Sequence, residues 1–516
     1  MQPQSAVAAN PFTRTQALFD GLCRRMQGAE AFAMTHSDLE RTVQHDGRAL
    51  LRQLLQDHLD LRGLHEQAAP HPFVVGNDGI ERPHHREAVR QLRTLVGDVV
   101  VPRLGYGQRG AQSRWPMDAA LNLPRDPYSL GIRYVVGLTV ARSAYEEGIA
   151  HIESTTGTHI PKRQAEHLAR EAAQDFDAFY AERVTPTGTA LSSLLILSCD
   201  GKGVVVRKED LRPATRKKAE QRVPRLKTRL TRGEKKHAKR MSTVAAIYTV
   251  CPHVRSAADI IDELCHNVPE PRPRRPKPEH KRVWACLRKE PTDVIRDLFD
   301  EAERRDPEHR KTWVVIVDGN ETQLALAQAE AKRRGVQVLV VLDFIHVLQY
   351  LWKASTAFYS EKAPEREVWV LDQLEQVLRG KATDVAAGIR RSATLHDLGQ
   401  QARLPVDDCA DYLLKYQAHL RYDQYLRDGL PIASGVIEGA CRHLVADRMD
   451  KSGAHWSLLG AEAVLQLRAL VSSGDFDAYW AFHERREYQR NHAVRYRGEV
   501  PSPNVPASSP RLRLAA

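Results

Sequence analysis

The sequence predicts an α/β protein whose central sheet gathers carboxylates at one edge. Three runs of consecutive apolar residues each lead to an aspartate, and they end at Asp200, Asp318 and Asp343. Such runs are typical of strands covered on both faces, because half-buried strands alternate polar and apolar residues. Ligand sites in open α/β sheets lie beyond the carboxyl ends of strands, so three such aspartates indicate one acidic site for a hard metal ion. A single Asp-Gly pair would indicate only a turn.

The order of the predicted elements refines this fold class. After Asp200, the motif Gly201-Lys-Gly203 predicts a tight hairpin into a second short strand over 204–207. The remaining elements are a strand, helix, strand, helix and strand over 243–250, 291–305, 313–318, 324–334 and 336–343. The first three strands are consecutive, which predicts antiparallel pairing. This is the order of an RNase H-like domain, in which the first and fourth strands each bring an aspartate to the same place.

Two modules are predicted at the start of the chain. Residues 1–70 form a helical region with a packing or dimer-forming role, and one of its helices opens at the capping box Ser37-Asp-Leu-Glu40. Residues 71–125 contain a small β-hairpin, because alternating residues flank a Gly97-Asp98 turn.

Residues 126–190 resemble a helix-turn-helix DNA-binding domain. A helix over 143–154 leads through a turn containing Gly157 to a second helix that begins at Pro161. The second helix carries the side chains expected to contact DNA, which are Lys162, Arg163, Gln164 and Arg170. Any helical hairpin can share this pattern, so a purely structural pair of helices is the alternative.

The charge of the chain points towards a polyanionic partner. Its 76 Lys and Arg residues outnumber 65 Asp and Glu residues, which gives a net charge of +11. The excess is densest over 207–240, where Arg216, Lys217 and Lys218 are candidate contacts to DNA phosphates. A run of charge is often only a solvated face or loop. A Pro-rich linker is expected over 267–282.

Cysteine usage and hydropathy indicate the compartment. The seven cysteines are scattered and form no Cys-x-x-Cys pair, which argues against a disulfide framework or a thiolate zinc site. No signal pattern is seen at the N-terminus, and the apolar runs are short. We therefore expect a soluble cytoplasmic protein that does not bind a membrane.

The candidate catalytic residues are Asp200, Asp318 and Glu438, which would bind two Mg²⁺ or Mn²⁺ ions. Two-metal sites need two or three carboxylates that leave coordination positions open. Asp343 is a rival third carboxylate because it also ends a strand. We interpret Asp343 and His346 as an accessory pair, in which the aspartate fixes the histidine tautomer. The alternative is a helix-capping aspartate followed by a core histidine.

The last part of the chain is predicted to be mostly helical. Residues 347–427 form an all-α segment inserted into the core 191–346, and 428–487 hold the final core helices. Ser434 is a plausible helix cap, and Glu438 falls in the first turn of a helix that also carries Arg442 and Arg448. Residues 488–516 are expected to be a flexible tail.

Two long motifs resemble the transposases of the ISKra family of bacterial insertion sequences, relatives of Mutator-like DDE transposases. The stretches 429–443 and 448–456 resemble the glutamate block of that family, and 342–352 resembles its Asp-x-x-His block. The resemblance covers about residues 75–490. Its one departure is Lys202, where the family usually has threonine after Asp-Gly.

This resemblance implies an Asp200, Asp318 and Glu438 triad with Asp343 and His346 as accessory residues. It also implies that a dimer or higher oligomer recognises the inverted repeats of the element, and we expect the protein near the bacterial nucleoid. Further candidate contacts to DNA are Arg442, Arg448 and Lys451. We therefore expect a transposase that binds element ends and target as double-stranded DNA. The alternatives are an RNase H-fold nuclease specific for DNA structure and an inactive, transposase-derived DNA-binding protein.

Overall fold

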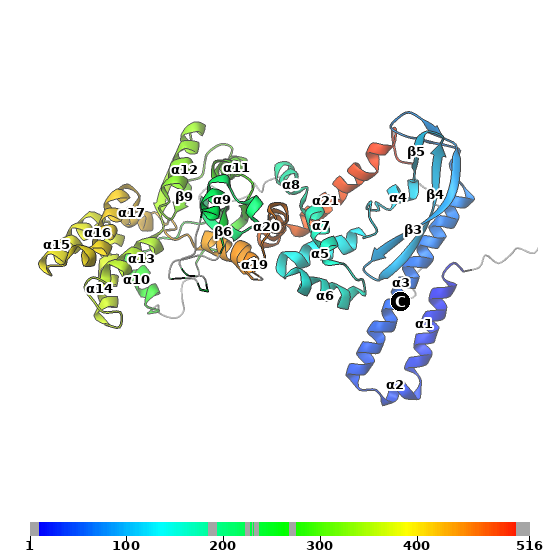
Figure 1. The fold of residues 1–516 in the computed structure, drawn as a ribbon, viewed down its shortest axis with the longest axis horizontal. Helices are drawn as coiled ribbons and strands as arrows, with labels where there is room; N and C mark the ends of the chain where they lie inside the picture. The colour runs from blue at the N-terminus through cyan, green and yellow to red at the C-terminus, as the bar shows by residue number, and fades with distance from the viewer. Residues whose placement is uncertain are drawn as a thin grey trace, which may run out of the picture. The chain divides into compact units, whose positions relative to one another are not determined.

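The computed structural model describes residues 10–183, 193–221, 226, 228–229, 231, 237–267, 275–451 and 453–501. The chain divides into two compact units. Unit 1 comprises Met1–Ala181 and Phe476–Ala516, and unit 2 comprises Glu182–Asp475. Figure 1 shows helices in both units and a sheet in each.

Unit 1 begins with the predicted helical region. Its helices are α1 (Thr13–Met26), α2 (Ala29–Ala33) and α3 (His36–Ala68), with α1 and α3 side by side in Figure 1. The cap of α3 is Thr35, whose hydroxyl accepts a hydrogen bond from the Asp38 amide at 3.3 Å. Thr35 and Asp38 have the spacing of a capping pair, so the helix starts earlier than the predicted box at Ser37.

The predicted β-hairpin follows, with longer strands than expected. Its sheet contains β3 (His84–Thr94), β4 (Gly97–Gln108) and β5 (Ala111–Arg114), and a separate pair contains β1 (Val74–Val75) and β2 (Glu81–Arg82). Thr94 pairs with Gly97, so Leu95 and Val96 make the turn, and the predicted Gly97-Asp98 turn is wrong because both residues belong to β4. Gly97 has φ of 114°, a conformation that glycine adopts readily. Leu59 of α3 packs with Leu92 in the core beneath the hairpin.

The next helices match the predicted helix-turn-helix pattern. They are α5 (Leu130–Arg142), α6 (Tyr145–Thr156) and α7 (Lys162–Ala173), which pack on one another, with α4 (Pro116–Ala120) before and α8 (Phe176–Glu182) after. Gly157 ends α6 in the left-handed conformation, with φ of 74°. Pro161 precedes the first residue of α7. DNA binding by this module remains a prediction.

The end of the chain departs from the predicted domain boundaries. Helix α21 (Phe476–Asn491) belongs to unit 1 and not to unit 2, although 428–487 were predicted as core helices, and its His483 bonds to Asp175 at 2.7 Å. The turn η4 (Ala493–Arg495) follows, and Tyr496 is buried where it bridges to Gly76. The flexible tail predicted from residue 488 is therefore wrong as far as Tyr496. The prediction failed because the segment is polar in sequence, although its aromatic and histidine side chains make contacts within unit 1.

Unit 2 is built on a five-stranded mixed sheet in the order β10-β9-β6-β7-β8. These strands are β6 (Leu194–Val205), β7 (Lys239–Val250), β8 (Glu279–Cys286), β9 (Trp313–Val317) and β10 (Val338–Leu342). β6, β7 and β8 pair antiparallel, and β9 is parallel to both β6 and β10. All residues of β9 are buried, as its continuous apolar sequence predicts.

The tight hairpin predicted at residues 201–203 was wrong. β6 runs unbroken to Val205 and pairs with β7 along its whole length. Gly203 permits close packing instead, because a Cβ there would lie 2.9 Å from Lys239 Cδ and 3.1 Å from its Cβ. The segment 243–250 is therefore part of the second strand. The third strand is β8, which begins inside the supposed linker 267–282, of which 268–274 lie outside the described residues.

Helices surround this sheet. α11 (Pro291–Arg305) packs on β6 and β7, whereas α18 (Gly435–Ala440) and η3 (Cys441–Ala446) contact β6 and β8. The segment predicted as all-α contains α13 (Phe344–Ser355), α14 (Glu365–Leu378), α15 (Ala382–Leu395), α16 (Gln400–Lys415), η2 (Gln417–His419) and α17 (Tyr422–Arg427). The other elements are η1 (Lys208–Asp210), α9 (Pro213–Glu220), α10 (Ala257–Leu264), α12 (Glu321–Arg334), α19 (Asp447–Met449) and α20 (Leu458–Ser473).

A compensated buried charge holds α11 to β8. The Glu301 carboxylate accepts hydrogen bonds from Arg282 at 2.7 Å, Arg304 at 2.8 Å and Arg305 at 2.9 Å. Burial opposes ionisation of Glu301, but the arginine charges and hydrogen bonds outweigh it and lower its pKa to about 2. This carboxylate is therefore ionised and structural.

Candidate active site

Two of the predicted catalytic carboxylates follow adjacent parallel strands at equivalent positions in the register. The pairing of β6 with β9 ends at Ser198 and Ile316, and Asp200 and Asp318 each lie two residues further along the chain. Adjacent strands are about 4.8 Å apart, so the two aspartates start from neighbouring positions. Burial and the negative charges of both aspartates raise the pKa of Cys199 to about 12. The sheet thus places Asp200 and Asp318 after neighbouring strands.

A tight turn after β9 presents Asp318. Gly319 has φ of 92°, and the Asn320 amide donates a hydrogen bond to Asp318 Oδ1 at 2.8 Å. Asn320 Oδ1 then caps α12 by accepting from the amides of Thr322 and Gln323 at 3.1 and 3.2 Å. The motif Asp-Gly-Asn therefore ends the strand, turns the chain and starts the helix.

Two tyrosines hold the backbone of this turn. The Tyr412 hydroxyl donates to the Asp318 carbonyl at 3.3 Å, and the Tyr416 hydroxyl donates to the Gly319 carbonyl at 2.6 Å. Tyr412 also stacks on Tyr350 of α13, with ring centroids 4.1 Å apart. Our sequence interpretation missed these residues. Their spacing of four on a helix, which puts both on one face, was the available signal.

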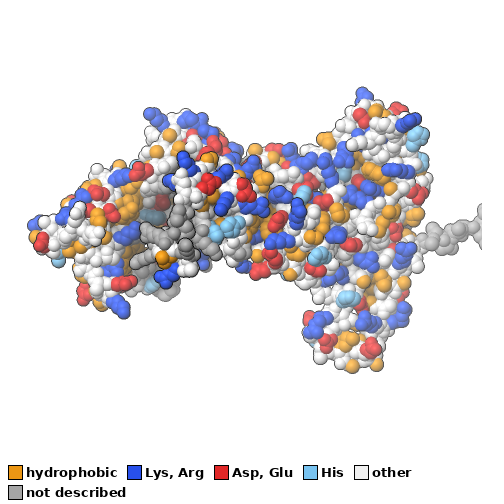
Figure 2. Space-filling view, in the orientation of Figure 1, with side chains coloured by type: hydrophobic (Ala, Val, Ile, Leu, Met, Phe, Trp, Pro, Cys, Tyr) orange, Lys and Arg blue, Asp and Glu red, His pale blue; other side chains and the backbone are white. Residues whose placement is uncertain are grey.

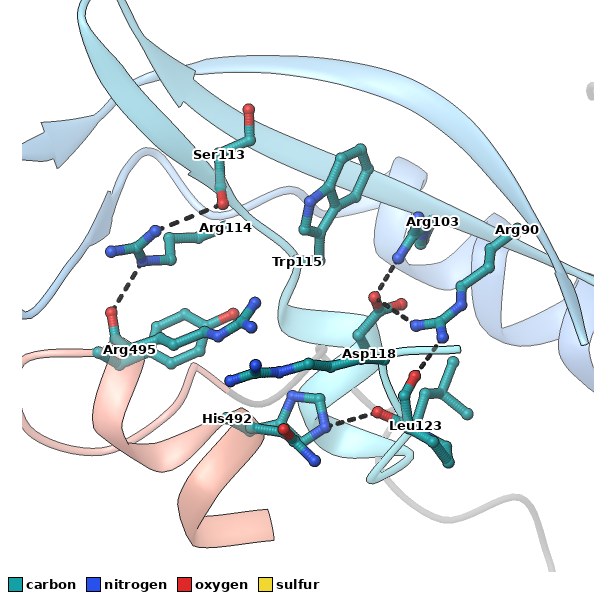
Figure 3. Close-up of a pocket in the computed structure, with 13 residues that line it drawn as sticks. Arg90, Arg103, Ser113, Arg114, Trp115, Asp118, Leu123, His492 and Arg495 are labelled. Atoms are coloured by element: carbon teal, nitrogen blue, oxygen red, sulfur yellow. Dashed lines mark hydrogen bonds and ion pairs between the residues drawn. The ribbon is translucent and has the colours of Figure 1, made fainter. Parts of the chain in front are cut away.

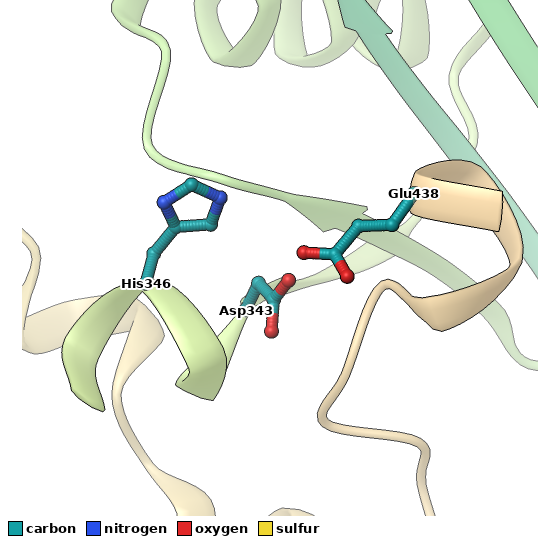
Figure 4. Close-up of side chains that lie close together, drawn as sticks. All are labelled: Asp343, His346 and Glu438. Carbon is teal, nitrogen blue, oxygen red and sulfur yellow. The ribbon is translucent and has the colours of Figure 1, made fainter. Parts of the chain in front are cut away.

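Asp343, His346 and Glu438 form the second half of the site (Figure 4). Their ligand atoms all lie within 4.8 Å of one another, and no other such trio was found among the described residues. Asp343 is buried at the start of α13, His346 lies one turn later and Glu438 extends from α18. Glu438 therefore lies beside the residues predicted as accessory, and the predicted ligand set of Asp200, Asp318 and Glu438 does not form such a group within the described residues.

The contacts of Asp343 differ from those predicted. Its Oδ1 accepts a hydrogen bond from the Ile345 amide at 2.9 Å and caps α13. Its Oδ2 accepts from the hydroxyl of Ser434, which was predicted to cap the next helix but makes no such bond. No hydrogen bond joins the His346 ring to Asp343 in the described structure. The predicted tautomer-fixing role is thus not seen. The alternative is correct for Asp343, which caps the helix, but His346 is only partly buried and is not a core histidine.

The electrostatics of this trio favour a bound cation. Burial raises the pKa of Asp343, with Ser434 acting in the opposite direction. Burial and the charge of Asp343 raise the pKa of Glu438, His346 opposes this rise, and Asp200 adds to it. Carboxylates that destabilise one another in this way lose the repulsion when they share a cation.

Cys441 links the glutamate helix to the first aspartate. Its thiol donates to Asp200 Oδ2 at 3.1 Å, and it begins the π-helical turn η3 directly after α18. Single π-helical turns are frequent at functional sites because they redirect side chains within a helix. Burial and the Asp200 charge raise the pKa of the Cys441 thiol, so it remains a donor at neutral pH. Sequence reasoning missed this contact, since nothing local to Cys441 points to Asp200.

Most residues predicted to contact DNA are exposed, and some of them already bond to other residues of the protein. Figure 2 shows Lys and Arg spread over the face drawn, among acidic side chains. The exposed candidates are Lys162, Arg163 and Arg170 on α7, Lys217 and Lys218 on α9, and Arg442 and Lys451, with Gln164 and Arg216 partly exposed. Lys162 pairs with Glu146, and Arg442 lies 3.7 Å from Asp447. Arg216 donates to the carbonyls of Glu209 and Leu211, which hold it against its own segment.

Arg448 does not suit the predicted role. It is only 1% exposed, and its guanidinium carbon lies 4.8 Å from the centroid of the Trp456 ring. A side chain this deeply buried is not available to a phosphate of DNA. Its position indicates that it supports the segment after η3 instead. In the sequence, every arginine carries the same charge, and the burial of its side chain is not visible.

Comparisons with known proteins leave the family open. The chain matches no protein-family model, and a search of the curated proteins finds no relative. Within the described residues, every helix is too short or too polar to cross a membrane. Function is therefore inferred from the geometry and chemistry of the sheet edge.

Proposed function

We propose that this protein is a DDE transposase with an RNase H-like core in unit 2. One observation supports the proposal: Asp200 and Asp318 follow neighbouring strands, Glu438 lies beside Asp343, and no cationic side chain of the described residues bonds to these carboxylates. Numbered along the chain, the sheet order is 5-4-1-2-3, in which the first and fourth strands are neighbours and carry Asp200 and Asp318. The helices 347–427 then correspond to an insertion before Glu438.

The donor set at this edge fits hard divalent ions. Asp200, Asp318 and Glu438 would hold two Mg²⁺ or Mn²⁺ ions, since these metals prefer carboxylate oxygens. His346 offers an imidazole, which suits Mn²⁺ better than Mg²⁺. When bound, such ions activate the attacking oxygen and stabilise the leaving oxygen of an in-line phosphoryl displacement.

The residues of the chain prepare this chemistry by fixing the carboxylates. Tyr412 and Tyr416 hold the turn that carries Asp318, Cys441 holds Asp200, and Ser434 holds Asp343. Hydrolysis at the end of the element would free a 3′-hydroxyl group, which then attacks a phosphodiester of the target DNA. The helix-turn-helix in unit 1 would bind the inverted repeats, with the protein acting as a homodimer or higher oligomer on DNA.

The decisive experiment is cleavage of a DNA duplex that carries the sequence flanking the gene. Purified protein and Mg²⁺ are compared with the Asp318→Asn variant. Asp372→Asn, an exposed change of the same chemistry on α14, is the matched control. We expect metal-dependent nicking at one defined position by the wild type and by the control, and none by Asp318→Asn. End binding should be nearly equal in all three.

Other outcomes would redirect the assignment. Binding without nicking under any divalent metal would favour an inactive DNA-binding relative. Nicking governed by branch structure instead of sequence would favour a nuclease. Loss of both binding and nicking in Asp318→Asn would show that Asp318 is structural.

A further inference from the structure

Unit 1 contains an arginine-lined cavity of about 410 Å³ that lies outside the proposed active site (Figure 3). The cavity lies between the segment that follows β5 and the end of α21 with η4. Five arginines line it, Arg90, Arg103, Arg114, Arg125 and Arg495, against a single acidic residue, Asp118. Its size is that of a small-molecule site, and its charge is strongly positive.

Three of these arginines are held by the protein itself. Arg90 and Arg103 share the Asp118 carboxylate, with Arg90 at 3.1 Å. Arg114 donates to the Arg495 carbonyl at 2.8 Å and to Asn77 Oδ1 at 3.0 Å. Arg114 also lies 3.7 Å from the Asp78 carboxylate, so two carboxylates face three guanidinium groups and positive charge remains.

The other two arginines lack intramolecular partners. Arg125 is exposed and Arg495 is partly exposed, and neither guanidinium has a hydrogen bond or an ion pair within the part of the chain that the structure describes. In addition, the Nε atom of Arg103 is buried without a hydrogen-bond partner. Because Arg103 lines the cavity, this N–H is a further donor that an anion bound there could use.

The surroundings of Arg103 preorganise its guanidinium. Its central carbon lies 4.1 Å from the centroid of the Trp115 ring. The ring also packs tightly on Gly105, where an added Cβ would lie 2.5 Å from ring atoms. A rigid aromatic support keeps the planar fork of the arginine in place, which lowers the entropy lost when an anion binds.

We propose that this cavity binds a phosphate group, carried either by DNA or by a free nucleotide. Arginine forks match the oxygens of phosphate, and the five arginines outnumber Asp118 and Asp78, the carboxylates that pair with them, which favours a multiply charged anion over a single carboxylate. Arg125 and Arg495 would supply the new contacts, and Arg103 the buried donor. This site does not depend on the catalytic assignment, because it lies wholly within unit 1.

The test uses the full-length protein and the double variant Arg125→Gln/Arg495→Gln. Binding of a 5′-phosphorylated duplex, of dAMP and of inorganic phosphate is measured by fluorescence anisotropy and competition. We expect the double variant to bind the phosphorylated ligand at least about tenfold more weakly, since hydrogen bonds to charged groups are strong. The control Arg24→Gln/Arg41→Gln removes the same charge from α1 and α3 and should retain most of the affinity.

The competition identifies the source of the phosphate. Displacement of the duplex by dAMP indicates a free nucleotide, whereas resistance to dAMP with a loss confined to the duplex indicates DNA. Both results support the site. Equal losses in the double variant and in the control would overturn the proposal. A second variant, Ser113→Asp, places a carboxylate among the arginines, and unchanged binding by it would also contradict the site.

Discussion

The acidic sheet edge of unit 2 and the arginine cavity of unit 1 gather charge of opposite sign. At the edge, carboxylates bond to a thiol, a hydroxyl and backbone amides, and to no cationic side chain of the described residues. In the cavity, Arg90 and Arg103 share the Asp118 carboxylate. The guanidinium groups of Arg125 and Arg495 have no partner in the described residues. Both sites leave charge of one sign uncompensated.

The buried Glu301 shows how the fold treats a purely structural charge. Three arginines bond to this single carboxylate, so its negative charge is fully compensated, in contrast to the carboxylates of the acidic edge. Charge that stays uncompensated costs stability, and proteins retain it mainly where a ligand supplies the counter-charge. The contrast therefore separates candidate binding sites from internal supports, and it can be tested in four ways.

The largest effect is expected at the acidic edge. Asp318→Asn should lower the cleavage rate by about a thousandfold, because it removes a carboxylate that contributes several kcal/mol to metal-assisted catalysis. The same change should leave thermal stability unchanged or slightly higher, since it relieves repulsion with Asp200. A marked fall in melting temperature would mean that Asp318 is compensated after all.

Removing a carboxylate should lower stability in the cavity, whereas at the acidic edge it should not. Asp118→Asn should destabilise unit 1 by about 3 kcal/mol, since it leaves the mostly buried Arg90 and Arg103 without their shared carboxylate. Urea unfolding followed by tryptophan fluorescence measures this change. Asp98→Asn, at an exposed position of the hairpin, is the control and should be neutral. An equally small effect of both changes would contradict a structural role for Asp118.

The compensated Glu301 predicts an acid-sensitive stability. Its pKa is about 2 in the folded protein and about 4.5 in the unfolded chain, which corresponds to about 3 kcal/mol. Because the folded pKa is depressed, this stability is present above pH 4.5 and is lost as the pH falls towards 2. Unfolding measured across this range should show a steeper loss in the wild type than in Glu301→Gln. Parallel curves would mean that the arginines do not stabilise the ionised form.

A smaller effect is expected at the edge of the metal trio. His346→Ala should lower cleavage by about tenfold, which is the lower end of the losses caused by residues that support a metal site. The loss should be smaller in Mn²⁺ than in Mg²⁺ if His346 only orients Glu438, and larger if the imidazole binds the metal. Cleavage unchanged in both metals would assign His346 to packing alone.

Much of the fold was predictable, because its signals are local. The continuous apolar runs at 313–317 and 338–342 produce buried strands, and Gly157 with Pro161 separates two helices. These features depend on hydrophobic periodicity and on backbone conformations that a few neighbouring residues decide. The hairpin predicted from the local motif Gly201-Lys-Gly203 was wrong, because pairing with β7 continues β6 through these residues.

The sequence by itself therefore specified which segments are strands and helices and which residues could act as acids, ligands or cations. Only the tertiary structure decided which of them meet. It brought Glu438 to Asp343, Cys441 to Asp200 and the C-terminal segment into unit 1, and it buried Arg448 against Trp456. These contacts join residues that are far apart in the chain. Packing and burial determine which residues meet, and no local sequence pattern predicts this.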